Sequence, residues 1–145
     1  MTFRPVQSDD VAEVDQFLQA HIETSVFLLA NLREFGAFGA AQDYAMTFWI
    51  TGDAINGVIA QSTKGIVMVQ CPDTHDWQDA LAAIPAPITG AIGEGHQINA
   101  ILTAAGLNDA PKNLDADEVL YALDLAKIIP QSGPGVLRAL NTGDA

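Results

Sequence analysis

The chain has 145 residues, of which 49% are hydrophobic, so it is long enough to bury the core of one ordinary domain. Eighteen acidic residues against six basic ones give a formal net charge of −12, which disfavours binding to nucleic acid or to an anionic membrane surface. Cys71 is the single cysteine, so no internal disulfide can form, and the three histidines lack the spacing of metal ligands. Because the sequence shows no signal-peptide pattern and no apolar run of membrane-spanning length, we expect a cytoplasmic protein.

The spacing of apolar and turn-forming residues predicts an α/β fold in layers. The expected elements are, in chain order, a strand at 2–6, helices at 8–20 and from 24 or 25 to 35, strands at 44–51, 56–62 and 66–70, a helix at 73–84, a strand at 87–92, a helix that follows a glycine turn and ends at Gly106, and a strand at 118–125. Two strand-helix-strand connections, one after Ile66 and one after Ile88, imply parallel pairing in the middle of the sheet.

The two expected N-terminal helices differ in character. Ser8 is the expected N-cap of the first, followed by acidic residues in its first turn. The second helix is apolar over a wide arc that includes Val26, Phe27, Leu28 and Leu29. So wide an apolar arc is either deeply buried or part of an interface, so we expect a homodimer, or contact with a second domain, through this helix.

Three stretches of the chain, taken in order, resemble the GNAT superfamily of N-acetyltransferases over residues 2 to about 125. They are FRPVQSDDVAEVDQFL near the start, AILTAAGL at the end of a helix, and DEVLYALDL in the last expected strand. The resemblance implies an acyl-CoA N-acyltransferase fold, with a mixed central sheet of about six or seven strands flanked by about four helices. It also implies acetyl-CoA as cofactor and an amine as acceptor.

A second resemblance concerns bacterial proteins that carry two GNAT-like domains in tandem. Their N-terminal domain often has a helix similar to ETSVFLLANLREFG, and the chain end LRALNTGDA is similar in residue type to FRPVQSDDV near the start. We therefore expect a GNAT-like domain at 1–126, a linker at 127–136 that is rich in proline and glycine, and the start of a second GNAT-like domain at 137–145. That second domain is the expected partner.

The resemblance places the acetyl-CoA loop after the strand at 66–70, where the family pattern is Arg/Gln-x-x-Gly-x-Gly/Ala. Here His75 stands where arginine or glutamine is expected, Gln78 replaces the essential glycine, and Ala80 fits the last position. The glycines of the family expose backbone N–H groups to the pyrophosphate at a helix N-terminus. A side chain at Gln78, next to the bulky Trp77, crowds that approach.

Charge and acid-base chemistry also argue against acetyl-CoA binding and catalysis in this domain. Asp73, Asp76 and Asp79 place carboxylates at the helix end where an anion would bind, although one helix-end charge is worth only about 0.3–1 kcal/mol. Leu102 stands where many family members have a tyrosine that protonates the leaving thiolate, and Tyr121 is expected as a half-buried residue of the last strand. We therefore assign no catalytic residue.

One glycine-rich loop, at residues 90–97, is a candidate ligand site. Gly93 and Gly95 free the backbone just ahead of a helix, where amides bind carboxylates or phosphates. His96 can change charge near neutral pH, and Glu94 can pair with it. Glycine turns before helices are also common without any ligand, and this one matches neither the P-loop nor the dinucleotide pattern.

These observations leave three hypotheses open. The first is an N-acetyltransferase in which this domain has lost the catalytic apparatus and a second domain carries it. The second is a GNAT-like module without catalytic activity that binds a ligand, packs against another domain or regulates it. The third is a sensor of small molecules that uses the loop at 90–97. Fold alone does not decide among them.

Overall fold

The computed structural model describes residues 2–39, 41–72 and 77–127. These residues form an α+β domain with one mixed sheet and four α-helices, which confirms the predicted layered class and the expected number of helices. The predicted linker beyond Lys127 and the predicted start of a second domain at 137–145 lie outside the described residues.

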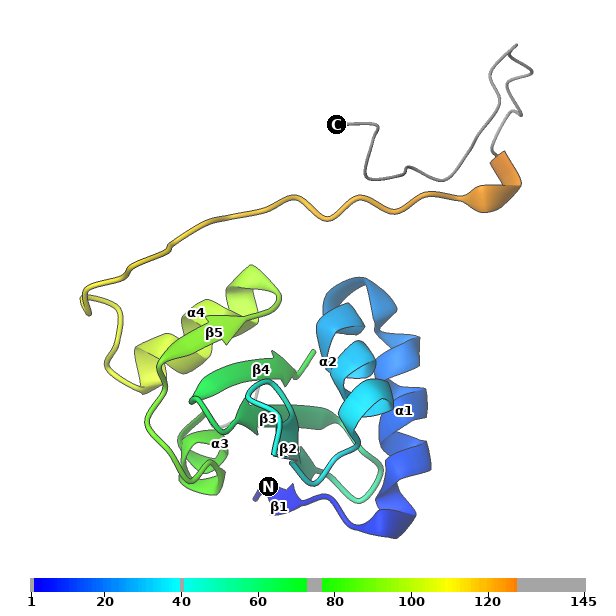
Figure 1. Cartoon of the computed structure of the whole chain (residues 1–145), viewed down its shortest axis with the longest axis horizontal. Helices are drawn as coiled ribbons and strands as arrows, with labels where there is room; N and C mark the ends of the chain where they lie inside the picture. The colour runs from blue at the N-terminus through cyan, green and yellow to red at the C-terminus, as the bar shows by residue number, and fades with distance from the viewer. Residues whose placement is uncertain (1, 40, 73–76, 128–145) are drawn as a thin grey trace, which may run out of the picture.

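Five strands form the sheet in the described part of the chain, and they lie side by side in chain order (Figure 1). They are β1 (Arg4–Pro5), β2 (Met46–Thr51), β3 (Gly57–Ser62), β4 (Ile66–Gln70) and β5 (Gly90–Ile92). The first four pair antiparallel, and β4 pairs parallel with β5. The expectation of six or seven strands is therefore wrong for this part of the chain. The parallel pairing across the first predicted crossover is confirmed, but it lies at the edge of the five-stranded sheet and not in its middle.

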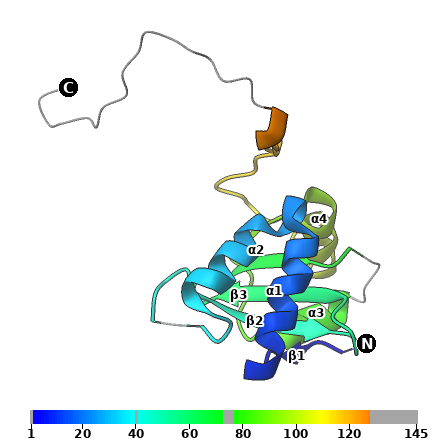
Figure 2. The same ribbon diagram turned by 90° about the vertical axis from the view of Figure 1, so that its right-hand side faces the viewer.

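The helices cover both faces of the sheet (Figure 2). Helices α1 (Val11–Ala20) and α2 (Ile22–Phe35) pack on one face, and α3 (Trp77–Ala83) and α4 (Gly95–Ala104) on the other. Each face has its own core, because successive strand side chains point to opposite sides. In the described residues no helix combines the length and the apolar character needed to cross a bilayer.

The central strands supply both cores. Phe48 of β2 and Val58 of β3 pack under α1 and α2, and both are fully buried. Trp49 and Ile59, one residue further along each strand, pack under α3 and α4. Burying one large apolar side chain contributes about 1.5–3 kcal/mol, so these two strands stabilise both faces of the sheet.

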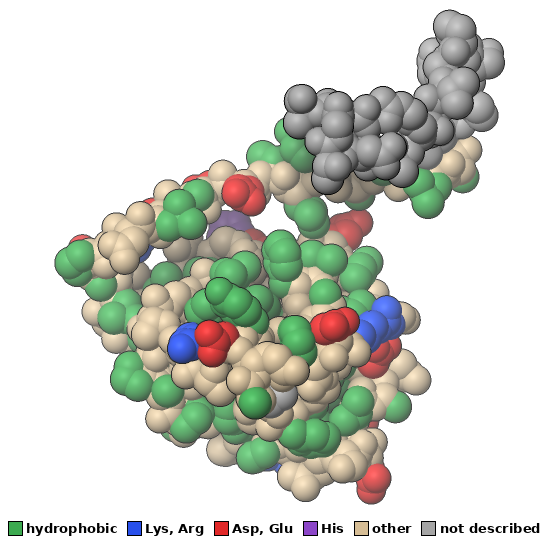
Figure 3. All heavy atoms as spheres, viewed as in Figure 1, with side chains coloured by type: hydrophobic (Ala, Val, Ile, Leu, Met, Phe, Trp, Pro, Cys, Tyr) green, Lys and Arg blue, Asp and Glu red, His purple; other side chains and the backbone are tan. Residues whose placement is uncertain are grey.

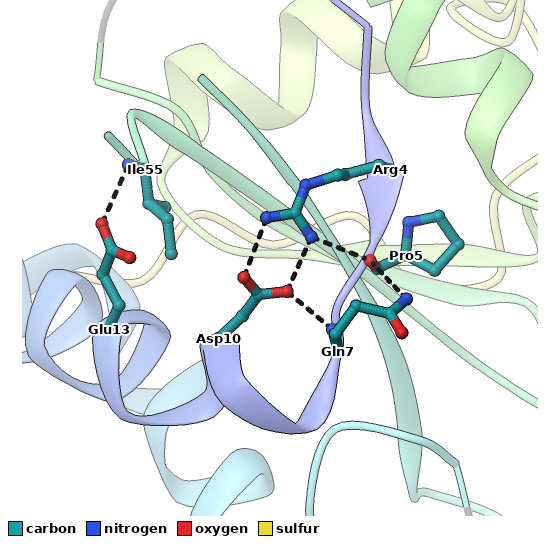
Figure 4. A network of polar contacts seen from close by, with 6 residues as sticks. All are labelled: Arg4, Pro5, Gln7, Asp10, Glu13 and Ile55. Atoms are coloured by element: carbon teal, nitrogen blue, oxygen red, sulfur yellow. Dashed lines mark hydrogen bonds and ion pairs between the residues drawn. The ribbon is translucent and has the colours of Figure 1, made fainter. Parts of the chain in front are cut away.

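The start of the first helix differs from the prediction. Ser8 is the first residue of a 3-10 turn (Ser8–Asp10), and Asp10 is the last. Its carboxylate accepts hydrogen bonds from the guanidinium of Arg4 at 2.6 and 2.8 Å and from the backbone N–H of Gln7 at 2.7 Å (Figure 4). The N-cap position predicted for Ser8 belongs instead to Gln7, and Asp10, at the third position of the turn, satisfies the backbone N–H of Gln7 as in a capping box.

The second helix begins at Ile22 and not at Thr24 or Ser25. The Ser25 hydroxyl is buried inside the helix, where it donates to the carbonyls of Leu18 and His21. A serine that bonds back to the preceding turn is part of a helix and does not start one. The helix ends at Gly36 as predicted.

The predicted strand at 118–125 is absent. No residue from 118 to 124 belongs to a strand, and Tyr121, expected to be half-buried, is 86% exposed. All residues from 111 to 127, here called the C-terminal arm, are exposed, and in Figure 1 the arm runs away from the sheet. The residue pattern favours a strand, but among the described residues the arm has no neighbouring strand to supply hydrogen bonds. The second predicted crossover, after Ile88, is therefore also wrong.

Candidate functional site

The candidate site lies where the two parallel strands end. In open α/β sheets, ligands bind outside the carboxyl ends of parallel strands. Here β4 and β5 run parallel with three residue pairs in register, from Ile66–Gly90 to Met68–Ile92. Helix α4 follows β5 after Gly93 and Glu94, so its N-terminus lies at the same edge.

The two strands part at Gly93. Val69 and Gln70 continue β4 without a partner in β5, because the chain turns away at Gly93, whose φ is +154°. An added Cβ at Gly93 would lie 3.3 Å from the side chain of Ile98. Where two parallel strands separate in this way, the backbone N–H and C=O groups on the facing edge lose their strand partners and can bind a ligand.

A side chain of the protein already fills this gap. The amide oxygen of Gln97, in α4, accepts a hydrogen bond from the backbone N–H of Cys71, the first residue after β4. Next to it, the buried side chain of Gln70 accepts at 2.7 Å from the hydroxyl of Thr24 in α2. The ends of the strands are thus cross-linked to helices on both faces of the sheet.

The N-terminus of α4 is also closed from within. The carboxylate of Glu94 accepts from the backbone N–H groups of His96 and Gln97, at 3.1 and 3.0 Å. Gly93, Glu94, Gly95 and His96, the residues of the predicted ligand loop, form the turn into α4, and there Glu94 bonds to backbone N–H groups and not to the side chain of His96. A carboxylate at a helix N-terminus takes the place that a bound anion would take.

The residues predicted at the acetyl-CoA loop do not form a cradle in the part that is described. His75 lies outside the described residues. Gln78, on α3, donates a hydrogen bond at 3.0 Å to the carbonyl of Ala104 at the end of α4. Ala80 is fully buried in the core under α3 and α4. Gln78 and Ala80 therefore hold α3 in place in the fold.

Cys71, the first residue after β4, is buried. Its thiol donates a weak hydrogen bond to the carbonyl of Val58 at 3.7 Å, and burial raises the pKa of the thiol to about 12. The nucleophilic form of cysteine is the thiolate, which is scarcely populated at neutral pH with such a pKa. Cys71 is therefore a structural residue.

Other candidate features lie away from the strand ends. One shallow hollow is bordered by apolar residues that include Leu81, Ile84 and Leu107, and another by residues that include Arg4 and Asp53. Within the described ranges, no group of three or more His, Cys, Asp or Glu side chains is arranged to hold a metal ion.

The sequence singled out the loop at 90–97 but not the residues that bond to it and to the end of β4. Thr24, Gln70 and Gln97 were not among the predicted site residues. A glutamine at the end of the apolar strand IVMVQ was a usable signal, because a buried amide needs a hydrogen-bonding partner. The contact of Gln97 with Cys71 spans 26 residues and had no local signal.

No protein-family model, curated protein or solved structure matches this chain.

Proposed function

We propose that this chain is a GNAT-like domain that has lost the ability to bind acetyl-CoA in the usual way, and that it belongs to an N-acetyltransferase whose second domain carries the catalysis. The layered α+β fold and the parallel β4–α3–β5 unit are compatible with the resemblance seen in the sequence. In this proposal the domain acts as a packing or regulatory module.

The observation that carries the proposal is the closure of the donor groups at the strand ends. A diphosphate bound at this edge of the sheet would need free backbone N–H groups, and those of Cys71, His96 and Gln97 are all bonded to side chains of the protein. A ligand at this edge would have to displace Gln97 or Glu94. Each lost hydrogen bond would leave a donor or acceptor of the protein without a partner. Such a group, if it stays buried and unpaired, costs about 1–3 kcal/mol.

Charge supports the same conclusion. The carboxylate of Glu94 lies at the helix end that an anion would approach, and the chain carries a net charge of −12. Both repel a diphosphate.

Helix α2 offers a surface for a second domain. Leu28 and Leu29 are buried in the core, whereas Val26 and Phe27 are 39% and 60% exposed. The wide apolar arc of the sequence is thus divided between the core and the surface. Exposed apolar side chains next to one another on a helix are typical of an interface, and we assign this one to the second GNAT-like domain of the same protein.

Thermal unfolding of the 145-residue chain with acetyl-CoA tests the proposal. A ligand that binds only the native state raises the melting temperature by mass action. We expect no rise with acetyl-CoA at about 1 mM, roughly the upper end of ordinary substrate affinities. A rise of several degrees, absent with ATP as a control anion, would contradict the loss of binding.

The matched experiment uses the longer protein with its second domain. There we expect acetyl-CoA to raise the melting temperature, and substitutions at Gln97 or Glu94 to leave that rise unchanged. Loss of the rise in these variants would place the cofactor in this domain.

A further inference from the structure

The C-terminal arm contains a strand-forming segment that is unpaired. Residues 118–125 alternate so that Val119, Tyr121 and Leu123 share one face, and these side chains are between 73% and 86% exposed. Figure 3 shows hydrophobic side chains standing out along the arm, above the folded domain. An exposed row of large apolar side chains in a soluble chain marks an interaction site.

The sheet contains a matching unpaired edge. In the described residues β5 pairs with β4 on one side only, so its other edge presents free N–H and C=O groups. Ile92 lies in register with Met68, on the face covered by α1 and α2, and is 43% exposed. An open edge with an exposed apolar side chain is a template for the addition of a strand.

The segment and the edge do not meet within one copy of the chain. Helix α4 and the residues after it lead the arm away from β5 (Figure 1), and every residue from 111 to 127 is exposed. Within the residues that the structure describes, each copy therefore offers one unpaired strand-forming segment and one unpaired edge. Two copies can satisfy both at once through a two-fold contact that closes on itself.

We propose that residues 118–125 of one copy pair as a sixth strand with the open edge of β5 in a second copy, and that the two copies exchange these segments reciprocally. The apolar face of the segment covers Ile92 on the α1 and α2 side of the sheet. The contact goes beyond the proposed function, because it needs neither a cofactor nor a second domain.

Proline substitutions test the backbone pairing. Neighbouring residues of a strand direct their N–H groups to opposite sides. One of the two substitutions, Ala122→Pro or Leu123→Pro, therefore removes a hydrogen bond to β5. The control is Leu114→Pro, which replaces another exposed leucine of the arm, 84% exposed against 73% for Leu123, outside the segment. Sedimentation or light scattering over a range of concentrations measures dimerisation of the 145-residue chain.

We expect the unchanged chain and Leu114→Pro to dimerise alike. At least one of the other two variants should dimerise about tenfold or more weakly, since one hydrogen bond and its neighbouring contacts are lost. The proposal is overturned if the unchanged chain stays monomeric at about 1 mM, the weak limit of measurable association. It is also overturned if both Ala122→Pro and Leu123→Pro dimerise like the unchanged chain.

Cross-linking distinguishes exchange from pairing within one chain. Ala91 of β5 is in register with Val67, on the face opposite Ile92, where Leu120 and Ala122 of the segment are expected to lie. A mixture of Ala91→Cys with Leu120→Cys or Ala122→Cys should give a disulfide-linked dimer of two different chains. Cys71 does not compete, because its thiol is buried. Cross-links that form only within doubly substituted chains would show that the segment pairs with its own β5, and would overturn the exchange.

Discussion

Strand β3 and residues 118–125 both have strand-forming sequences, but the first is buried in the sheet and the second is exposed. Val58, Ile59 and Ala60 of β3 are completely buried, with β2 on one side and β4 on the other. In the arm, Val119, Leu120 and Tyr121 are all more than 60% exposed. The preference of a residue for strands is a preference for a pleated, half-buried surface, so it takes effect only where neighbouring strands exist. In this chain, turns join β2, β3 and β4 directly, whereas the arm follows a helix and thirteen further residues, from 105 to 117.

The sharpest test of this comparison removes one aromatic ring from each region. Phe48→Ala should destabilise the fold by about 3–5 kcal/mol, because Phe48 is fully buried and its loss leaves a cavity. Tyr121→Ala should change the free energy of unfolding by less than about 0.5 kcal/mol in dilute solution, because that ring is in solvent. Urea unfolding followed by tryptophan fluorescence measures both. Equal losses in the two variants would mean that the arm packs on the domain.

A second test concerns the turn that leads into β4. Gly65 has φ +83°, and an added Cβ would lie 2.5 Å from the carbonyl of Pro87, just before β5. Gly65→Ala should therefore cost about 1–3 kcal/mol, from backbone strain and the contact with Pro87. Gly95→Ala is the control, since Gly95 begins α4 with nothing within 4 Å of an added Cβ. That variant should be neutral or slightly more stable in thermal unfolding, and a loss equal to that of Gly65→Ala would contradict this view.

A third test concerns the bond that closes the candidate site. Gln97→Ala should cost about 1 kcal/mol, because the backbone N–H of Cys71 loses its acceptor. Gln97→Glu is the matched control, because a carboxylate can accept the same bond and suits the first turn of a helix. Hydrogen exchange at the Cys71 amide reports the bond directly. Faster exchange in the alanine variant alone is expected, and unchanged exchange in both would show that Gln97 does not protect this amide.

Local patterns predicted most of the folded part, and contacts distant in sequence account for the errors. The run IVMVQ predicted β4 to the residue, because apolar β-branched residues are bounded by a glycine turn and Pro72. The same reasoning failed at 118–125, where the deciding factor is an absent neighbour. At the candidate site the loop was visible as glycines, but its closure depends on Glu94 and Gln97 turning to particular amides. That choice reflects the packing of α4 against β4, which local sequence does not encode.

The smallest expected effect is the pH dependence of the Arg4–Asp10 pair at the other end of the sheet. The hydrogen bonds from Arg4 and from the Gln7 backbone lower the pKa of Asp10 to about 2, from an ordinary value of 3.8. A carboxyl whose pKa is depressed in the folded state stabilises that state above its unfolded pKa, and the contribution is lost as the pH falls. Stability should therefore decline between about pH 4 and pH 2, and Asp10→Asn should lose most of this decline while being less stable near pH 7.

Asp9→Asn, at the exposed neighbouring position, is the control, and urea unfolding at successive pH values is the measurement. Parallel pH profiles for the unchanged chain and Asp10→Asn would show that the pair is open in solution, as exposed ion pairs often are.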